Sequence, residues 1–289
     1  MIVRLSGGLG NQMFQYAFGR AVSIVKGEEL YLDDYAFKRD PKREYALGLY
    51  NINAKQLGGI KKIYFNIMFY LNRKIHFIPK GKSKFGMYYE KNEFEKEEIN
   101  KIDALYFEGY WQNINYFDNI SHILKNELAF KGRIRKEVKE LGKTLLDNIV
   151  IAVHVRHGDY LNINNKLIYE VPDAEYYRRA MQYMRQLFPE CSFCFFSDDI
   201  DWCIEEFGKE KNCIFPARDT SYTAQEDIYL MQQCSHYIIA NSSFSWWAAF
   251  LGAGDNTICV APQKWYKDEL LNEKVRKGLL CNFILMENQ

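Results

Sequence analysis

The sequence lacks any apolar run long enough to cross a bilayer, since none reaches the roughly 18 to 20 residues required. Its opening residues, MIVRLSGG, turn polar too quickly for a signal peptide. Low-complexity linkers and fixed-period repeats are also missing. With no route out of the cell encoded here, we expect a cytoplasmic protein.

Net charge is almost absent, because 38 Lys and Arg oppose 37 Asp and Glu to leave +1 at pH 7. This balance argues against a general nucleic-acid-binding protein, so no nucleic-acid partner is expected. The seven cysteines are odd in number and show no zinc-finger spacing. We expect the one close pair, Cys191 and Cys194, to be buried thiols rather than a metal or redox site.

What the sequence does contain is a regular alternation of apolar strands and amphipathic helices. In the first forty residues, IVRLSG predicts a strand, GGLGNQ a tight loop and MFQYAFGRAVSIV a helix ending at Gly27, before ELYLDD forms a second strand. Such a β-α-β unit carries its loop at the carboxyl end of the first strand, where ligands bind.

The second half repeats the alternation after a helix over RIRKEVKELGKTLLD. Strands are predicted at 148–155, at SFCFFSDD and at HYIIAN, with TICVAP as the last strand, and helices lie between them. The fold class is therefore α/β, with two Rossmann-like domains at 1–145 and 146–289.

Residues 55–89 carry eight Lys or Arg and no Asp or Glu, interleaved with aromatic residues. Five apolar residues in this segment mark one face of a helix: Ile60, Tyr64, Ile67, Met68 and Leu71. Two interpretations stay open. The segment is an amphipathic helix with solvated lysines, or it is a basic surface for anionic lipid headgroups or a charged acceptor.

Three loops of the second half fall at the carboxyl ends of predicted strands: HVRHGDY, FSDD and NSSFSWW. Parallel strands bring such loops to one edge of the sheet. The guanidinium of Arg156 suits a phosphate, and the hydroxyls and free N–H groups of a serine-rich helix start favour an anion. The carboxylates of Asp198 and Asp199 can accept from a guanine or a ribose. Together these groups predict a site for a nucleoside diphosphate.

Other interpretations apply to the same residues. The serines and aspartates are common helix caps. The run Asp198–Asp201 resembles a divalent-metal site, but no further ligand cluster supports it, and no metal is expected. In GGLGNQ, Gly8 and Gly10 begin a dinucleotide fingerprint whose last glycine position holds Met13, which weakens a nicotinamide-dependent oxidoreductase. A carbohydrate-binding module using Trp246 and Trp247 is a third alternative.

Three stretches together resemble the signatures of bacterial α-1,2-fucosyltransferases, glycosyltransferase family 11: GGLGNQMFQYAFGRA, HVRHGDY and NSSFSWWAAFLGA. The resemblance spans residues 7 to 254. It implies a GT-B type fold, with two Rossmann-like domains facing a cleft. It also implies a GDP-fucose donor and inverting transfer, without a metal or other cofactor, to the 2-hydroxyl of galactose in an oligosaccharide acceptor. Peripheral contact with a membrane or a lipid-linked glycan is compatible with this activity, as is a transferase using another GDP-sugar.

The resemblance also assigns roles to residues. Arg156 would hold the β-phosphate, His154 would approach the nucleoside and Asp198 would read guanine. Arg156, Asp159 and Asn11 are the expected catalytic residues, and Asp159 is either the general base or an anchor for Arg156. His157 occupies the place of a second arginine in the family pattern, and it and Glu170 are weaker candidates for the base. The expected donor-binding residues are Gly10, Asn11, Gln12, His154, Arg156, Asp198, Asp199, Asn241, Ser242, Ser243, Phe244 and Ser245.

Overall fold

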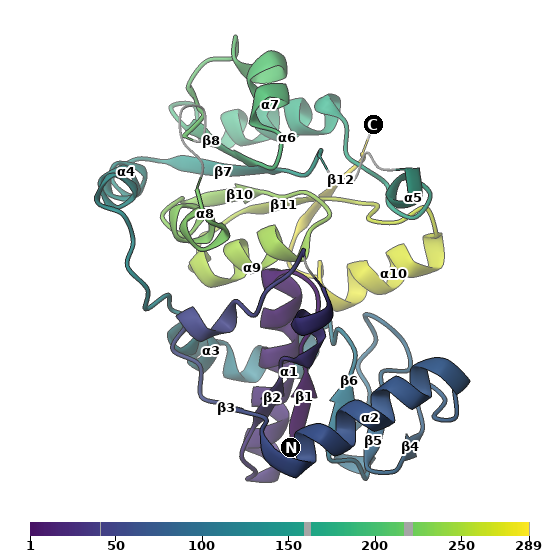
Figure 1. The fold of residues 1–289 in the computed structure, drawn as a ribbon. Helices are drawn as coiled ribbons and strands as arrows, with labels where there is room; N and C mark the ends of the chain where they lie inside the picture. Colours follow the sequence, from purple (N-terminus) through teal and green to yellow (C-terminus); the bar gives the residue numbers. More distant parts are fainter. Residues whose placement is uncertain (41, 159–162, 217–221, 289) are drawn as a thin grey trace. The chain divides into compact units, whose positions relative to one another are not determined.

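The chain divides into two compact units, Met1–Lys131 and Gly132–Gln289, each built around one six-stranded sheet. The structure, a computed structural model, describes residues 1–40, 42–158, 163–216 and 222–288 (Figure 1). Within these ranges no helix is both long and apolar enough to span a membrane.

The division comes earlier than the predicted boundary after residue 145, because helix α4 (Lys136–Leu146) belongs to the second unit. Its Val138 and Leu145 are fully buried. Arg135, just before α4, donates two hydrogen bonds of 2.8 Å to the Glu226 carboxylate on α8. The helix predicted to end the first domain is thus part of the second unit.

The first unit has a mostly parallel sheet of order β3-β2-β1-β6-β5-β4, in which only β4 and β5 pair antiparallel. Its main elements are β1 (Ile2–Arg4), α1 (Leu9–Lys26), β2 (Tyr31–Asp33), β3 (Lys55–Gln56), α2 (Gly59–Ile75), β4 (Ser83–Lys84), β5 (Met87–Tyr89), β6 (Tyr106–Glu108) and α3 (Ser121–Glu127).

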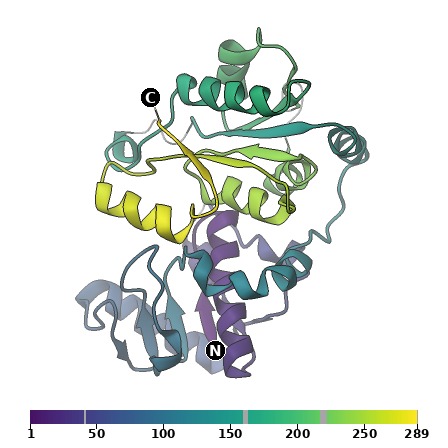
Figure 2. The ribbon, with the colours of Figure 1, turned by 180° about the vertical axis from the view of Figure 1, so that it is seen from behind.

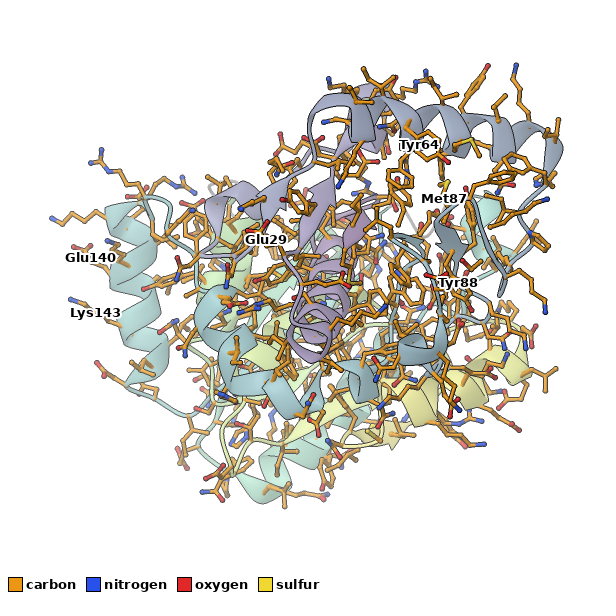
Figure 3. All side chains as sticks on the ribbon, turned by 90° about the horizontal axis from the view of Figure 1, so that it is seen from below. Glu29, Tyr64, Met87, Tyr88, Glu140 and Lys143 are labelled. Atoms are coloured by element: carbon orange, nitrogen blue, oxygen red, sulfur yellow. The ribbon has the colours of Figure 1, made fainter. Side chains whose placement is uncertain are left out.

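Helices α1 and α2 cover opposite faces of this sheet. Phe18 of α1 packs against Phe107 of β6, whereas Phe65 of α2 stacks on Tyr106, with ring centroids 4.7 Å apart. Neighbouring residues of a strand point to opposite faces, so the two helices lie on different sides. Figure 3 shows labelled residues of this layer, Tyr64 on α2 and Met87 on β5.

Helix α1 begins earlier than predicted, at Leu9, so that the residues expected in a loop form its first turn. The turn is made by Gly7, whose φ of 76° lies in the left-handed region that favours glycine. The predicted end of α1 is confirmed, because Gly27 has φ 65° and caps the helix.

The second unit has an all-parallel sheet of order β12-β11-β10-β7-β8-β9. Helices α6 and α7 lie on one side of this sheet and α8 and α9 on the other, as Figures 1 and 2 both show. Beyond α4, its elements are β7 (Val150–Val155), α5 (Ile163–Lys166), α6 (Ala174–Leu187), β8 (Ser192–Ser197), α7 (Ile200–Phe207), β9 (Cys213–Ile214), α8 (Ala224–Met231), β10 (His236–Ile238), α9 (Ser243–Gly252), β11 (Cys259–Pro262), α10 (Glu269–Gly278) and β12 (Ile284–Met286).

The predicted strands and helices of this half are confirmed up to β11, but the prediction that TICVAP is the last strand is wrong. Helix α10 and strand β12 follow it, and β12 adds an edge strand to the sheet. In the order of the six strands, the chain starts in the middle at β7, goes outward through β8 and β9, and returns to the other side at β10. The buried Cys191 and Cys194 carry free thiols, as expected.

Candidate active site

The reversal of strand order in the second unit lies between β7 and β10, which pair in parallel. In open parallel sheets this switch point is where ligands bind, at the carboxyl ends of the strands. The loops after β7 and β10 both start there, and β8 lies on the other side of β7. The rings of His154 and Phe244, one from each side of the switch point, have centroids 5.5 Å apart. Three of the predicted loops therefore share one edge.

Asp198 ties the loop after β8 to the loop after β7. Its Oδ1 accepts hydrogen bonds from the backbone N–H groups of His157 (3.0 Å) and Gly158 (3.2 Å). Its Oδ2 lies 3.4 Å from Nη1 of Arg156. Burial disfavours the carboxylate, but Arg156 and the two N–H groups outweigh it and lower the pKa of Asp198. Both oxygens of Asp198 thus have partners within the protein, and the expected reading of guanine by this residue stays a prediction.

Arg156 therefore has an internal counter-charge at the mouth of a buried strand. Its side chain is 25% exposed, so the guanidinium also faces the solvent side of the switch point. One carboxylate satisfies part of a five-donor group. This arrangement can hold Arg156 in place while its remaining donors bind a phosphate.

His157 and Asp199 form a second pair at the same edge. The Nδ1 of His157 lies 2.8 Å from Oδ2 of Asp199, and its ring stacks on Trp202 at a centroid distance of 4.4 Å. Asp199 also caps α7, since its Oδ1 accepts from the Trp202 N–H at 3.2 Å. These two contacts hold Asp199 in place, and the donor-binding role expected of it stays a prediction.

His154 lies under this loop and is almost completely buried. Burial first, and then the charge of Arg156, lower the pKa of His154 to about 3. The imidazole is therefore neutral at physiological pH. Its Nδ1 is a buried polar atom at the switch point that has no hydrogen-bond partner among the described residues.

The loop after β10 and the first turn of α9 together contain five of the expected donor-binding residues, and these five lie in different environments. Asn241 is buried and donates to the carbonyls of Glu170 and Trp265, both at 3.1 Å. Ser245 is fully buried, and its hydroxyl donates to the Ser242 carbonyl. Asn241 and Ser245 thus make contacts within the second unit, and the donor-binding role expected of them stays a prediction.

Ser242 is the N-cap of α9, where its hydroxyl accepts from the Phe244 N–H at 3.3 Å. Ser243 and Phe244 are half-buried and follow directly in the first turn. The start of a ten-residue helix offers the positive end of a dipole, which favours an anion. Among these five residues, Ser243 and Phe244 are the ones that a bound anion can reach.

In the first unit, the first turn of α1 contains Gly10, Asn11 and Gln12, which differ in how deeply they are buried. Gln12 is 1% exposed and makes three hydrogen bonds: its amide donates to the Gly7 and Glu44 carbonyls and accepts from Ala46 N–H. The Gln12 amide is therefore engaged within the first unit, and Gly10 is buried beside it; the donor-binding role expected of both residues stays a prediction. Asn11 is half-buried and accepts from Nε2 of Gln112 at 2.9 Å.

Glu90 is a candidate functional residue that we did not predict from the sequence. It follows β5, is 5% exposed, and accepts hydrogen bonds from the N–H groups of Tyr110 (2.7 Å) and Trp111 (3.2 Å). Burial raises the pKa of Glu90 to about 7, although these bonds act in the opposite direction. The available signal was its place as the first acidic residue after the acid-free segment 55–89.

Asp159, the expected base, lies outside the described residues. Glu170, the weaker candidate, pairs with Lys267. Among the described residues, no group of three His, Cys, Asp or Glu is arranged to hold a metal ion. The Asp198–Asp201 run, considered as a metal site, has its first two carboxylates engaged with Arg156 and His157.

The chain is similar to known proteins over nearly its whole length. Residues 1–284 match the family model described as Glycosyl transferase family 11. An alpha-1,2-colitosyltransferase of Escherichia coli is 34% identical over an alignment of 292 positions, and the alignment covers 94% of this chain and 94% of that protein. The galactoside alpha-(1,2)-fucosyltransferase 2 of Pongo pygmaeus is 26% identical over an alignment of 176 positions, which covers 58% of this chain and 51% of that protein.

Among solved structures, that of an Arabidopsis thaliana FUT1 mutant in complex with GDP is similar, with a TM-score of 0.50 and 13% identity. The likeness covers 89% of this chain and 69% of that chain. It concerns the fold, which is of the GT-B type with two Rossmann-like units. Because the family match covers nearly all residues, the chain belongs to glycosyl transferase family 11 and is a glycosyltransferase.

Proposed function

We propose that this protein transfers L-fucose from GDP-β-L-fucose to the 2-hydroxyl of a terminal galactose in an oligosaccharide, inverting the anomeric carbon to form an α-1,2 linkage. The observation that carries the proposal is the placement of Arg156 and the start of α9 on either side of the switch point. The names of related proteins, an α-1,2-colitosyltransferase and an α-1,2-fucosyltransferase, support the linkage.

In this proposal the diphosphate of the donor binds at the switch point. Arg156, held by Asp198, offers its remaining donors to the β-phosphate. The start of α9, at Ser243 and Phe244, binds the same diphosphate from the other loop, favoured by the positive end of the helix dipole. The unsatisfied Nδ1 of His154 lies at the base of this site and accommodates a polar group of the bound nucleotide.

The reaction displaces GDP from the sugar. The 2-oxygen of the acceptor attacks the anomeric carbon, the bond from that carbon to the β-phosphate oxygen breaks, and negative charge builds on that oxygen. A preorganised donor at such a position typically contributes on the order of 3 kcal/mol of transition-state stabilisation. We assign this role to Arg156 and propose that no metal is required, so turnover should persist in excess EDTA.

The proton of the acceptor hydroxyl needs a base, and Asp159 is the residue we propose for it or for anchoring Arg156. The two roles differ in donor affinity. If Asp159 is the base, Asp159→Asn should bind GDP as the wild type does and lose turnover. If it is an anchor, the same variant should bind GDP more weakly. Asn11 is the proposed contribution of the first unit to the reacting sugar.

A related donor is the second candidate, because the E. coli colitosyltransferase shares 34% identity over nearly the full chain. Colitose is fucose without its 3-hydroxyl, so both sugars present the same leaving group. The deciding experiment measures GDP release from GDP-fucose, GDP-colitose and GDP-mannose with a panel of β-galactosides. We expect the highest kcat/KM with GDP-fucose and an α-1,2 product by NMR. If the protein prefers GDP-colitose, the donor is GDP-colitose rather than GDP-fucose. If GDP is released from none of the three donors, the proposal is contradicted.

A further inference from the structure

Helix α2 carries its apolar stripe on the outside of the protein. Ile60 is 85% exposed, Ile63 62% and Ile67 53%. The inner side of the helix is separately apolar, since Phe65 packs on Tyr106 in the core of the first unit. The exposed apolar residues recur at helical spacing: Ile60, Ile63, Tyr64, Ile67, Tyr70, Leu71 and Ile75. An ordinary surface helix presents polar residues there.

Figure 3 shows this helix from below, with many side chains projecting from α2 away from the labelled Met87 and Tyr88 of β5. Of the five residues predicted to share an apolar face, Ile60, Tyr64, Ile67 and Leu71 are exposed to solvent, whereas Met68 packs against the core. This outcome disfavours the interpretation that α2 is an ordinary amphipathic helix with solvated lysines.

Basic residues surround the stripe. Lys61 and Lys74 lie on α2 itself and are exposed, and the segment 55–89 has no acidic residue. Within the part of the chain that the structure describes, neither lysine forms an ion pair, although Lys74 lies over the Tyr70 ring at 4.7 Å. Their charge is thus available to an outside anion.

A groove of about 410 Å³ runs beside the stripe, between α2 and the short 3-10 helix η1 (Tyr35–Arg39). Its walls combine three cations with apolar and aromatic side chains: Lys38, Arg39, Lys62, Ile63, Ile67 and Tyr70. Lys62 is paired with Asp34 at 2.7 Å. The groove has the same mixed character as the stripe, with positive charge at the edge of an apolar surface.

The β4–β5 hairpin extends this surface. At its turn Phe85 is 53% exposed and has φ 55°, followed by Gly86 at φ 72°. A left-handed conformation is unfavourable for a bulky residue, so Phe85 is held in a strained turn with its ring exposed. The Tyr64 hydroxyl donates to the Phe85 carbonyl, which places the turn next to α2.

We propose that this surface, the outer stripe of α2 with its basic rim and Phe85, binds peripherally to a membrane that contains anionic lipids. Apolar and aromatic side chains enter the boundary between headgroups and acyl chains, and lysines are attracted to the negative surface. A second copy of the chain fits less well. A two-fold contact would place the same basic residues opposite one another, without acidic residues in this segment to compensate.

The test uses the full chain and sedimentation with vesicles of phosphatidylcholine alone or with phosphatidylglycerol added. We expect binding to the anionic vesicles only, weakened by 1 M NaCl, which screens surface charge to about 3 Å. The Lys61→Gln/Lys74→Gln variant should bind about thirtyfold more weakly, because each lysine near an anionic surface contributes roughly a factor of five. Ile63→Ser/Ile67→Ser should lose at least about tenfold.

The matched control is Leu146→Ser/Leu270→Ser, which removes leucines that are 64% and 69% exposed on α4 and α10. It should bind vesicles as the wild type does. Turnover of a soluble β-galactoside and the melting temperature should be unchanged in all three variants, so that lost binding is not lost folding. Absence of binding to anionic vesicles, equal loss in the control, or a dimer that Ile63→Ser/Ile67→Ser dissociates would each overturn the proposal.

Discussion

At the scale of single residues, the site is organised by the charge of Arg156. Asp198 compensates this charge from the neighbouring strand and at the same time accepts from the His157 and Gly158 N–H groups. One carboxylate therefore fixes both the guanidinium and the loop that carries it. A charge placed beside a buried strand would be costly without such a partner.

This geometry predicts how Asp198→Asn behaves. An amide keeps one acceptor oxygen but cannot balance the charge of Arg156, so the loop should lose its order and GDP should bind about tenfold more weakly or worse. Isothermal titration with GDP and with inosine diphosphate, which lacks the 2-amino group, separates the roles of Asp198. We expect the variant to weaken both nucleotides equally. A loss confined to GDP would instead mean that Asp198 reads guanine.

His154 makes folding stability depend on pH. Its pKa is about 3 in the folded protein and near 6.5 when unfolded, so between these values only the unfolded chain binds the proton. Stability from this group is complete above pH 6.5 and falls as the pH decreases towards 3. Between pH 7 and 5 the wild type should lose about 2 kcal/mol more than His154→Phe, measured by urea unfolding. Parallel pH profiles of the two proteins would rule this out.

At the scale of elements, the first turn of α1 places two amides next to each other with different roles. Gln12 is buried with three hydrogen bonds, whereas Asn11 is half-buried and accepts a hydrogen bond from Gln112. Neighbouring residues of a helix point about 100° apart, so one can face the core and the next the surface.

Alanine substitutions should separate these roles. Gln12→Ala leaves buried backbone groups unpaired and should lower the free energy of unfolding by about 1–3 kcal/mol. Asn11→Ala should change stability little and reduce kcat, if Asn11 contacts the reacting sugar. Thermal unfolding and donor turnover, measured on both variants, check the assignment. The reverse pattern, a stable Gln12→Ala and an unstable Asn11→Ala, would show that the roles are exchanged.

The elements near the site were largely predictable, because apolar runs ending at Val155 and Ser197 mark buried strands. Helix α10 was missed since its sequence, ELLNEKVRKG, is mostly polar. The pairing of Arg156 with Asp198 could not be predicted, because it joins residues far apart in sequence. Periodicity identified the apolar face of α2, but it gives no direction for that face, and the structure shows it exposed.

At the scale of the whole molecule, two units each carry a sheet with its own polar carboxyl edge. Membership of glycosyl transferase family 11 removes two alternatives, the nicotinamide-dependent oxidoreductase and the carbohydrate-binding module without catalysis. The glycines of the incomplete fingerprint, Gly8 and Gly10, instead form the N-cap and the first turn of α1. Trp246 and Trp247 are buried, so they do not offer their rings to a sugar.

The position of α4 predicts where the second unit can be separated. A fragment of residues 132–289 retains the Arg135–Glu226 pair and the buried Val138 and Leu145. It should unfold in one cooperative transition. A fragment of residues 147–289 exposes the surface of α8 that α4 covers and should aggregate or unfold without cooperativity. Calorimetry on both fragments tests this, and equal behaviour would favour the boundary near residue 146.

The most direct test of the transferase mechanism is turnover of Arg156→Lys, with Arg178→Lys as a control for an ion-paired arginine on α6. A lysine keeps the positive charge but not the forked donors, so we expect GDP to bind within a few fold of the wild type while kcat falls about 10²- to 10³-fold. The control should turn over normally. A variant Arg156→Lys with near-wild-type kcat would contradict the role of this guanidinium in stabilising the departing diphosphate.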